Sequence, residues 1–428
     1  LCFINSPFLY ERIFMNKKRV IIVGGGAAGM LASIFAAKNG CEVTLFEKNE
    51  KLGKKLYITG KGRCNVTNDC SPEELLNSVV QNAKFLYSAF YTFTSQDMMD
   101  FLEEAGTPLK TERGNRVFPC SDHSSDIIRT LERKMKEYGV CIHLKSQVKS
   151  LLLEEGKAEG VCLSDGSVCK GDAVIVATGG LSYPTTGATG DGYRFAEKAG
   201  HSVTELSPSL VPLHTKEDYI PEMAGLSLKN VELTVKNGKK ILYRDFGEMM
   251  FTHSGITGPL VLSASAHIGT ALKKNGELTA FLDLKPALSP EQLDSRILRE
   301  FETRKNKQFK NVIGVLFPSS LTPVMLKIGG IPPEKPIHEI SREERLRFGA
   351  FVKAFPFTII GFGEFKEAVI TRGGVSVKEI NPATMESKKV SDLYFVGEVL
   401  DLDAVTGGFN LQIAWSTAYL AAMAVCGE

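Results

Sequence analysis

Three glycines and one acidic residue near the start of the chain have a spacing that could bind a dinucleotide. Gly24, Gly26 and Gly29 form a G-x-G-x-x-G pattern, and Glu47 follows about 20 residues later. In this pattern the first glycine permits a tight turn, the second lets the backbone approach a pyrophosphate, and the third lets a helix pack closely on a strand. A carboxylate at the position of Glu47 can accept hydrogen bonds from ribose hydroxyls, which argues against a ligand with a 2′-phosphate. A glycine turn that binds no nucleotide is the alternative.

The elements that would position these residues flank the glycines. Residues 19–23 are almost entirely apolar and β-branched, which predicts a strand buried on both faces of a parallel sheet. Residues 30–37 are apolar and mostly small, as in a helix that packs on a sheet, and residues 42–46 form a second predicted strand. The amino end of the helix would point its free amides at the phosphates.

The segment after Glu47 favours FAD over NAD. From Lys48 to Asn68 the chain is a basic loop with several glycines, where a simple NAD domain would continue with a helix and a strand. Such a loop can run along an extended cofactor and supply cations to its pyrophosphate. A basic loop that is merely solvated is the alternative.

Two distant segments have the features of the same domain. Residues 173–180 are a predicted buried strand that ends in two glycines, and residues 392–398 are another strand that ends in a glycine and an acid. The stretch 406–412 then precedes an apolar closing helix, whose amino end would stabilise the negative charge of a reduced flavin. A glycine-rich helix cap without a ligand is the alternative here.

These motifs resemble the aminoacetone oxidase and bile-acid dehydro-reductase family of bacterial FAD-binding proteins. The resemblance extends from Lys17 to the C-terminus and implies an α/β fold. Its FAD-binding domain would be three-layered, Rossmann-like and of the glutathione-reductase type, interrupted by an insertion that is β-rich and helical. The resemblance implies no single substrate. The segments that carry it are GKK at 53–55, GRCNVTN at 62–68, RVFP at 116–119, FTHSGITGP at 251–259, GEVLD at 397–401 and TGGFNLQ at 406–412.

The residues expected to contact FAD come from all of these segments. Glu398 and Asp401 are both candidates for the contact with the ribityl chain. The full expected set is Gly24, Gly26, Ala27, Ala28, Gly29, Glu47, Lys48, Lys54, Lys55, Arg63, Asn65, Val148, Thr178, Gly179, Gly397, Glu398, Asp401, Gly408, Phe409, Asn410 and Leu411.

The predicted domain order follows from changes in pattern along the chain. Helices are placed by capping boxes, S-x-x-[EQ], that begin at Ser71, Ser289 and Ser341. The insertion is expected to cover the flavin and to build the substrate pocket. The predicted parts are the first part of the FAD-binding domain at 15–204, a β-rich insertion at 205–285, a helical insertion at 286–355, a β-rich return at 356–370 and the second part of the FAD-binding domain at 371–428.

Few side chains outside the cofactor segments point to catalysis. His253 could act as a general acid, or simply hydrogen-bond a turn, and Arg116 could receive an acidic substrate, or form a structural salt bridge. Cys64 is followed at six residues by Cys70, which is not the close pair of a disulfide reductase, so packing near FAD is the better interpretation. The histidines form no i, i+4 pair, so no metal is expected.

Composition limits the remaining function classes. A net charge of +2 gives no footprint of a nucleic-acid binder, and nine scattered cysteines without a C-x-x-C pair are typical of reduced thiols in the cytoplasm. No run of about 18 to 20 uncharged apolar residues is expected, hence no membrane span. Residues 1–14 form an extension of unknown role before Met15, the natural start.

The sequence therefore predicts a cytoplasmic FAD-dependent oxidoreductase that acts on a small organic molecule. Its electrons would pass to oxygen, as in an amine oxidase, or to an enone-like acceptor, and NADH or NADPH is a candidate donor. The alternative is a non-catalytic flavin-binding protein or a tRNA-associated FAD protein. The oligomeric state is not predicted.

Overall fold

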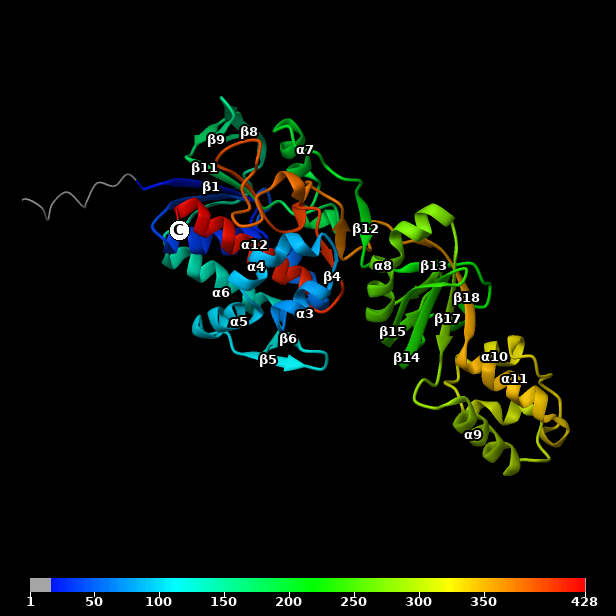
Figure 1. Cartoon of the computed structure of the whole chain (residues 1–428). Helices are drawn as coiled ribbons and strands as arrows, with labels where there is room; N and C mark the ends of the chain where they lie inside the picture. The colour runs from blue at the N-terminus through cyan, green and yellow to red at the C-terminus, as the bar shows by residue number, and fades with distance from the viewer. Residues whose placement is uncertain (1–16, 428) are drawn as a thin grey trace, which may run out of the picture. The chain divides into compact units, whose positions relative to one another are not determined.

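The computed structural model describes residues 17–427 as two units (Figure 1). The first unit runs to Leu206 and resumes at Arg372, and the second comprises Ser207–Thr371. The expectations about residues 1–14 and about Met15 lie outside the described residues.

A five-stranded sheet organises the first unit. All of its pairings are parallel, in the order β20-β11-β1-β2-β7. The central strands are buried because they are apolar on both faces, as the β-branched sequence of residues 19–23 predicts. The strands are β1 (Arg19–Val23), β2 (Glu42–Phe46), β7 (Cys141–His143), β11 (Ala173–Val176) and β20 (Leu393–Phe395).

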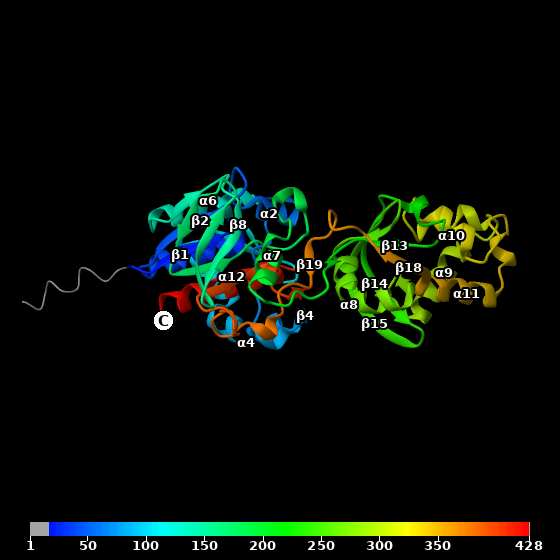
Figure 2. The same cartoon turned by 90° about the horizontal axis from the view of Figure 1, so that it is seen from above.

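Two further layers complete this unit. Helix α1 (Ala27–Lys38) packs against α12 (Phe409–Cys426) and α6 (Ser124–Glu137). The antiparallel sheet β10-β9-β8 contacts β11 through β9, and Figure 2 shows this unit from above. Its strands are β8 (Val148–Glu154), β9 (Lys157–Leu163) and β10 (Val168–Lys170). The expected three-layer, Rossmann-like α/β fold is confirmed.

Smaller elements fill the segment between β2 and α6. A hairpin is formed by β5 and β6, to which the short β3 is added. These elements are α2 (Lys54–Ile58), β3 (Thr67–Asn68), α3 (Pro72–Asn77), β4 (Val79–Gln81), α4 (Tyr87–Thr92), α5 (Ser95–Glu104), β5 (Leu109–Glu112) and β6 (Arg116–Pro119).

Helix α12 corrects one expectation from composition. Its 18 residues carry no charge, and it is the one helix within residues 17–427 that is long and apolar enough to cross a membrane. The expectation that no such run exists is therefore wrong. However, 61% of the helix is buried within the protein. Trp415 is fully buried, and its Nε1 donates a hydrogen bond to the carbonyl oxygen of Val66 at 2.9 Å. A helix enclosed by its own protein is apolar all round for that reason.

A six-stranded closed barrel forms the core of the second unit, in the order β13-β16-β15-β14-β17-β18. A turn at Asn237 and Gly238 joins its two longest strands. The strands are β13 (Leu213–Thr215), β14 (Ser227–Asn237), β15 (Lys240–Phe251), β16 (Gly255–Thr257), β17 (Leu278–Asp283) and β18 (Phe355–Phe362).

Helix α8 (Pro259–Asn275) was not predicted, because strands were expected to dominate residues 205–285. Its residues are small and apolar without a clear helical period, so periodicity gave no signal. The start of the helix does carry a sequence signal. Gly258 has φ +104°, and Pro259 occupies the first helical position, where proline is favoured.

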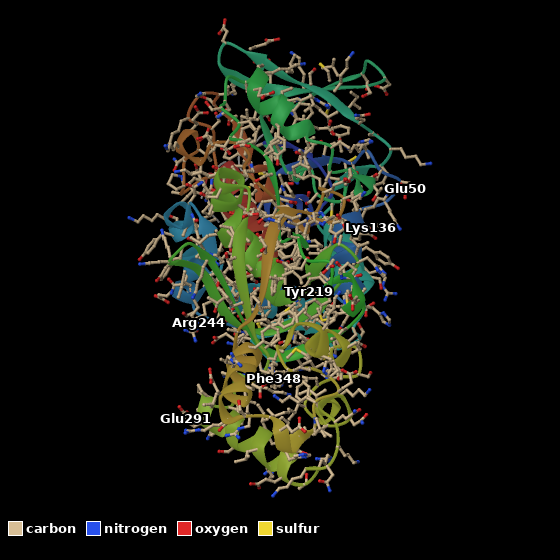
Figure 3. All side chains as sticks on the ribbon, turned by 90° about the vertical axis from the view of Figure 1, so that its right-hand side faces the viewer. Glu50, Lys136, Tyr219, Arg244, Glu291 and Phe348 are labelled. Atoms are coloured by element: carbon tan, nitrogen blue, oxygen red, sulfur yellow. The ribbon has the colours of Figure 1, made fainter. Side chains whose placement is uncertain are left out.

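The helical part of the second unit agrees with the capping signals. Capping boxes form at Ser289 before α9 (Pro290–Glu302) and at Ser341 before α11 (Arg342–Lys353), as the one at Ser71 does in the first unit. Phe348 is fully buried, with its ring 5.4 Å from that of Phe309. Figure 3 shows Phe348 among the helices and Glu291 at their outer edge.

A buried histidine should make the first unit sensitive to acid. His201 follows α7 (Asp191–Lys198), and its Nε2 lies 2.7 Å from Ser387 Oγ while its Nδ1 lies 3.2 Å from Glu379 Oε2. Burial lowers the pKa of His201 below its ordinary value of 6.5. The unfolded chain therefore binds a proton on this histidine more readily than the folded protein does. The free energy of unfolding is highest above pH 6.5, and part of it is lost as the pH falls from there through the pKa of the folded state.

We expect the melting temperature of the first unit to fall between about pH 7 and pH 5, and His201→Gln to flatten that dependence. The control is His338→Gln, which changes an exposed histidine of the second unit. An unchanged pH dependence in His201→Gln would contradict this assignment. Thermal melts followed by circular dichroism measure it.

Candidate functional site

The glycines in the turn between β1 and α1 have two different roles. Two of them are required by the fold, and one leaves room for a ligand. A Cβ at Gly24 would lie 2.6 Å from the carbonyl oxygen of Ala177, and one at Gly29 would lie 1.9 Å from that of Gly24. The fold itself therefore requires these two glycines. A Cβ at Gly26 would meet nothing within 4 Å. Gly26 caps α1 with ordinary extended angles, and no side chain caps the first amides of the helix. This opening fits a pyrophosphate.

Glu47 is tied to the glycine turn. Its buried carboxylate accepts a hydrogen bond from the amide of Gly25 at 2.7 Å and one from the amide of Asn49 at 2.8 Å. Oε1 also accepts a hydrogen bond from Asn49 Nδ2 at 2.7 Å, so it is Oε2 that keeps a further lone pair for a ribose hydroxyl. The amide of Ser146 donates to the carbonyl oxygen of Glu47, which places Val148 near the same edge of the sheet.

Residues far apart in the sequence meet around this turn. A Cβ at Gly397 would lie 3.1 Å from that of Ala28, and one at Gly179 would lie 3.7 Å from Glu398 Oε2. A Cβ at Gly408 would lie 2.4 Å from the backbone of Thr67. The predicted segments therefore come together in the first unit, and at Gly408 only a glycine allows so close an approach.

A polar triad joins three of these segments. Lys55 Nζ lies 2.6 Å from Glu398 Oε2 and 2.5 Å from Ser182 Oγ, and Ser182 Oγ lies 2.9 Å from Glu398 Oε1. Lys55 and Glu398 are among the expected contacts of the cofactor. Ser182 is not, because the only signal for it is its position two residues after the glycine pair.

The other expected cations also have acidic or polar partners in the protein. Lys48 Nζ lies 2.6 Å from Asp191 Oδ2, and Lys54 Nζ lies 3.4 Å from Asn49 Oδ1. Asp401, the second candidate for the ribityl contact, is buried and accepts a hydrogen bond from Gln81 Nε2 at 2.7 Å.

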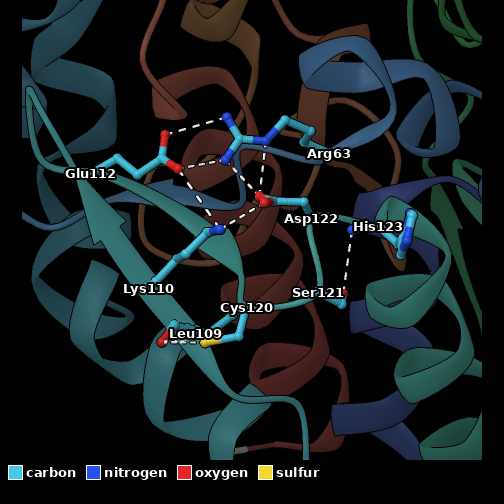
Figure 4. A network of polar contacts seen from close by, with 8 residues as sticks. All are labelled: Arg63, Leu109, Lys110, Glu112, Cys120, Ser121, Asp122 and His123. Atoms are coloured by element: carbon cyan, nitrogen blue, oxygen red, sulfur yellow. Dashed lines mark hydrogen bonds and ion pairs between the residues drawn. The ribbon is translucent and has the colours of Figure 1, made fainter.

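Arg63 is held in a charged network (Figure 4). Its Nε donates to Asp122 Oδ1 at 2.9 Å, its Nη1 lies 3.3 Å from Glu112 Oε2, and Lys110 Nζ lies 2.7 Å from Asp122 Oδ2. The guanidinium carbon lies 4.1 Å from the ring centre of Phe118. Hydrogen bonds to the two carboxylates raise the pKa of Arg63. Arg63 is thus held in place by Glu112 and Asp122, and its contact with FAD stays a prediction.

The amino end of α12 has the features expected near a flavin. Gly408 has φ +99°, and no side chain caps the helix. The Asn410 side chain turns back and donates to the carbonyl oxygen of Ala404 at 2.8 Å, so it shapes the preceding loop. Phe409 and Leu411 are partly exposed.

Two buried polar atoms close to these segments have no hydrogen-bond partner among the described residues, Asn65 Oδ1 and Thr178 Oγ1. Buried polar groups are rarely left unpaired, so a ligand that supplies partners is expected. Together with the open space above Gly26, they fit FAD.

Cys64 is unsuited to thiolate chemistry. It is fully buried, and burial raises its pKa to about 12, as it does for Cys70. Both stay protonated at neutral pH, and neither is in a disulfide. We expect Cys64→Ala to keep its FAD and to turn over within about twofold of the unchanged protein, since the thiol only fills space. Cys70→Ala is the matched control. Loss of turnover with FAD still bound would contradict this expectation.

The two catalytic candidates lie in different units. His253 is exposed, in the second unit, on the turn between β15 and β16. Arg116 begins β6 in the first unit, where its Nε donates to the carbonyl oxygen of Arg113 at 3.1 Å. Both roles remain predictions. The described residues contain no group of three or more His, Cys, Asp or Glu that could hold a metal ion.

A parallel sheet, a glycine turn at its centre and a facing helix terminus are features of flavin-dependent oxidoreductases with a Rossmann-like domain. Residues 18–424 match the family described as HI0933-like protein Rossmann domain, and the chain belongs to this family. The resemblance inferred from the motifs is thus confirmed. The protein is an FAD-dependent oxidoreductase.

Two relatives match nearly the whole chain. The 3-dehydro-bile acid delta(4,6)-reductase of Clostridium scindens is 31% identical, over 95% of this chain and 98% of its own. The ribosomal RNA dihydrouridine synthase of Haemophilus influenzae is 33% identical, with the same coverage. The solved structure of 3-ketosteroid delta1-dehydrogenase from Sterolibacterium denitrificans has a TM-score of 0.54, covers 96% of this chain and 100% of its own, and at 13% identity shows the fold alone.

Proposed function

We propose that this protein reduces a carbon–carbon double bond conjugated to a carbonyl group, with FAD as the electron carrier. The observation that carries the proposal is what the two full-length relatives have in common. A delta(4,6)-reductase of a 3-dehydro bile acid saturates a bond in conjugation with a ketone. A dihydrouridine synthase adds hydrogen across the uracil double bond that is conjugated to a ring carbonyl. This choice favours the enone-like acceptor over oxygen.

Different residues of the first unit would bind different parts of the cofactor. Glu47 would hold the adenosine ribose, and the amides that follow Gly26 would hold the pyrophosphate. The amino end of α12, from Gly408 to Leu411, would face the flavin ring. Bound FAD supplies a two-electron carrier that can deliver a hydride to the carbon β to the carbonyl.

The protein side of the reaction is positioning and electrostatics. The amino terminus of α12 carries roughly half a positive charge, which stabilises negative charge placed before it. Lys55 and Glu398 neutralise each other at 2.6 Å, so the triad keeps the glycine loops in place without adding net charge. Asn65 and Thr178 offer polar atoms that the protein leaves unpaired.

NADH or NADPH is the proposed electron donor. The described part of the chain contains one strand, glycine turn and helix of the dinucleotide-binding type, formed by β1 and α1, and we assign it to FAD. The nicotinamide would therefore bind transiently, beside the flavin. Anaerobic bleaching of the flavin by each donor measures this preference directly. If neither donor bleached the flavin, another reductant would have to be sought.

The acceptor is tested with protein reduced by light under anaerobic conditions, without any nicotinamide. A steroid with a dienone should restore the absorbance of oxidised flavin, whereas the matched saturated ketone should not. Equal rates with both steroids would contradict the proposal. So would reduced flavin that is reoxidised by air but neither by the dienone nor by a uridine in RNA.

A uridine in RNA is the second candidate substrate, favoured by the relative that is 33% identical. The net charge of +2 is a sum over the whole chain, so it does not exclude a local basic surface that binds nucleic acid. The β14–β15 hairpin carries exposed cations at its tip, Lys239 and Lys240, and Arg244 further along β15. Conversion of uridine to dihydrouridine in an RNA fragment, detected by mass spectrometry, is the matching assay. RNA turnover without steroid turnover would identify this substrate class.

A further inference from the structure

Two cysteines outside the cofactor segments lie in direct contact. Cys41 Sγ is 2.8 Å from Cys426 Sγ, although 385 residues separate them. Cys41 stands immediately before β2, and Cys426 is the last residue of α12. Both are thiols, and they do not form a disulfide. Cys41 is buried and Cys426 is partly exposed, so a small oxidant can approach from the side of Cys426.

Cys41 differs electrostatically from Cys64 and Cys70. The hydrogen bond from Cys426 lowers the pKa of Cys41, the charge of Lys18 acts in the same direction, and burial opposes both. By contrast, burial raises the pKa of Cys64 and of Cys70 to about 12. Thiolates are the reactive form of cysteine, so Cys41 is more reactive than these two.

We propose that Cys41 and Cys426 are a reversible oxidation site that forms a disulfide with hydrogen peroxide as oxidant. The Cys41 thiolate attacks a peroxide oxygen, the O–O bond breaks, and a sulfenic acid forms with release of hydroxide, which takes up a proton to become water. The Cys426 sulfur then attacks the sulfenic sulfur, the S–S bond forms, the S–O bond breaks, and the hydroxyl leaves as water with the Cys426 proton. Two thiols lose two electrons in total, and one peroxide is reduced to two waters.

The disulfide would connect two elements that carry the cofactor segments. Strand β2 ends at Phe46, directly before Glu47, and α12 begins at Phe409, directly after Gly408, at the end that we propose faces the flavin. The bond would close a very long loop of chain, which restricts the unfolded state most. We therefore expect oxidation to raise the melting temperature of the first unit by roughly 5 °C.

The test uses the full chain with FAD bound. The protein is reduced, freed of reductant, treated with hydrogen peroxide, alkylated and digested without further reduction. Mass spectrometry should find a peptide pair that links Cys41 to Cys426, with two alkylatable thiols fewer per chain, and dithiothreitol should restore both. The melting temperature is measured on the same samples.

The variants make the result decisive. Cys426→Ser should lose the linked peptides and the gain in melting temperature, whereas Cys120→Ser, which changes an exposed cysteine, should keep both. The proposal is overturned if peroxide oxidises Cys120 while Cys41 and Cys426 stay unlinked. It is also overturned if Cys41 is linked to a different cysteine, or if Cys426→Ser still loses two thiols.

Discussion

Gly26→Val is expected to give a folded protein that purifies without FAD. The backbone of Gly26 has φ −83°, which valine tolerates, and a Cβ there meets no protein atom within 4 Å. The added methyl groups would fill only the space proposed for the pyrophosphate. Steric overlap between the valine and the phosphates, or displacement of the phosphates by it, should cost about 1–3 kcal/mol of binding free energy. This cost corresponds to a loss of FAD affinity of roughly 10- to 100-fold. Flavin absorbance per chain measures the loss, and circular dichroism checks the fold.

The control for this variant is Gly349→Ala, a glycine of α11 in the second unit that also has room for a side chain. It should keep its FAD. Two outcomes would count against our placement of the pyrophosphate: normal FAD content in Gly26→Val, or its unfolding.

Gly408→Ala should instead destabilise the first unit. Its φ of +99° strains any other residue, and a Cβ would lie 2.4 Å from the backbone of Thr67. Strain and overlap together should cost about 2–4 kcal/mol, and the amino end of α12 should move away from the flavin position. Urea denaturation and FAD content measure the two effects.

The same helix provides a matched control at its other end. Gly427 has φ +83°, but a Cβ there meets nothing within 4 Å. Gly427→Ala therefore carries the backbone strain without the overlap, and it should cost only about 1 kcal/mol. If both variants were equally stable, the close approach of Gly408 to Thr67 would be wrong.

The elements with a local signal are those that the sequence predicts well. The apolar, β-branched run at 19–23 became β1, and Ser71, Ser289 and Ser341 each cap a helix with the reciprocal hydrogen bonds of a capping box. The glycine pattern predicted the turn because Gly24 and Gly29 leave no room for a Cβ. In each case the cause lies within a few residues of the effect.

Features that depend on distant partners could not be predicted. Arg63 is paired with Glu112 and Asp122, and nothing near Arg63 in the sequence indicates these carboxylates. Ser182 joins the triad only because the fold brings α2 and Glu398 to it. The contact of Cys41 with Cys426 spans almost the whole chain. Long-range pairing of this kind follows from tertiary packing, which one sequence does not reveal.

The most direct measurement is a crystal structure of the protein with FAD bound. Our account predicts the adenosine ribose against Glu47, the pyrophosphate over Gly26 and the flavin ring before the amides that follow Gly408. FAD bound to the second unit, or in the first unit away from these three segments, would contradict it.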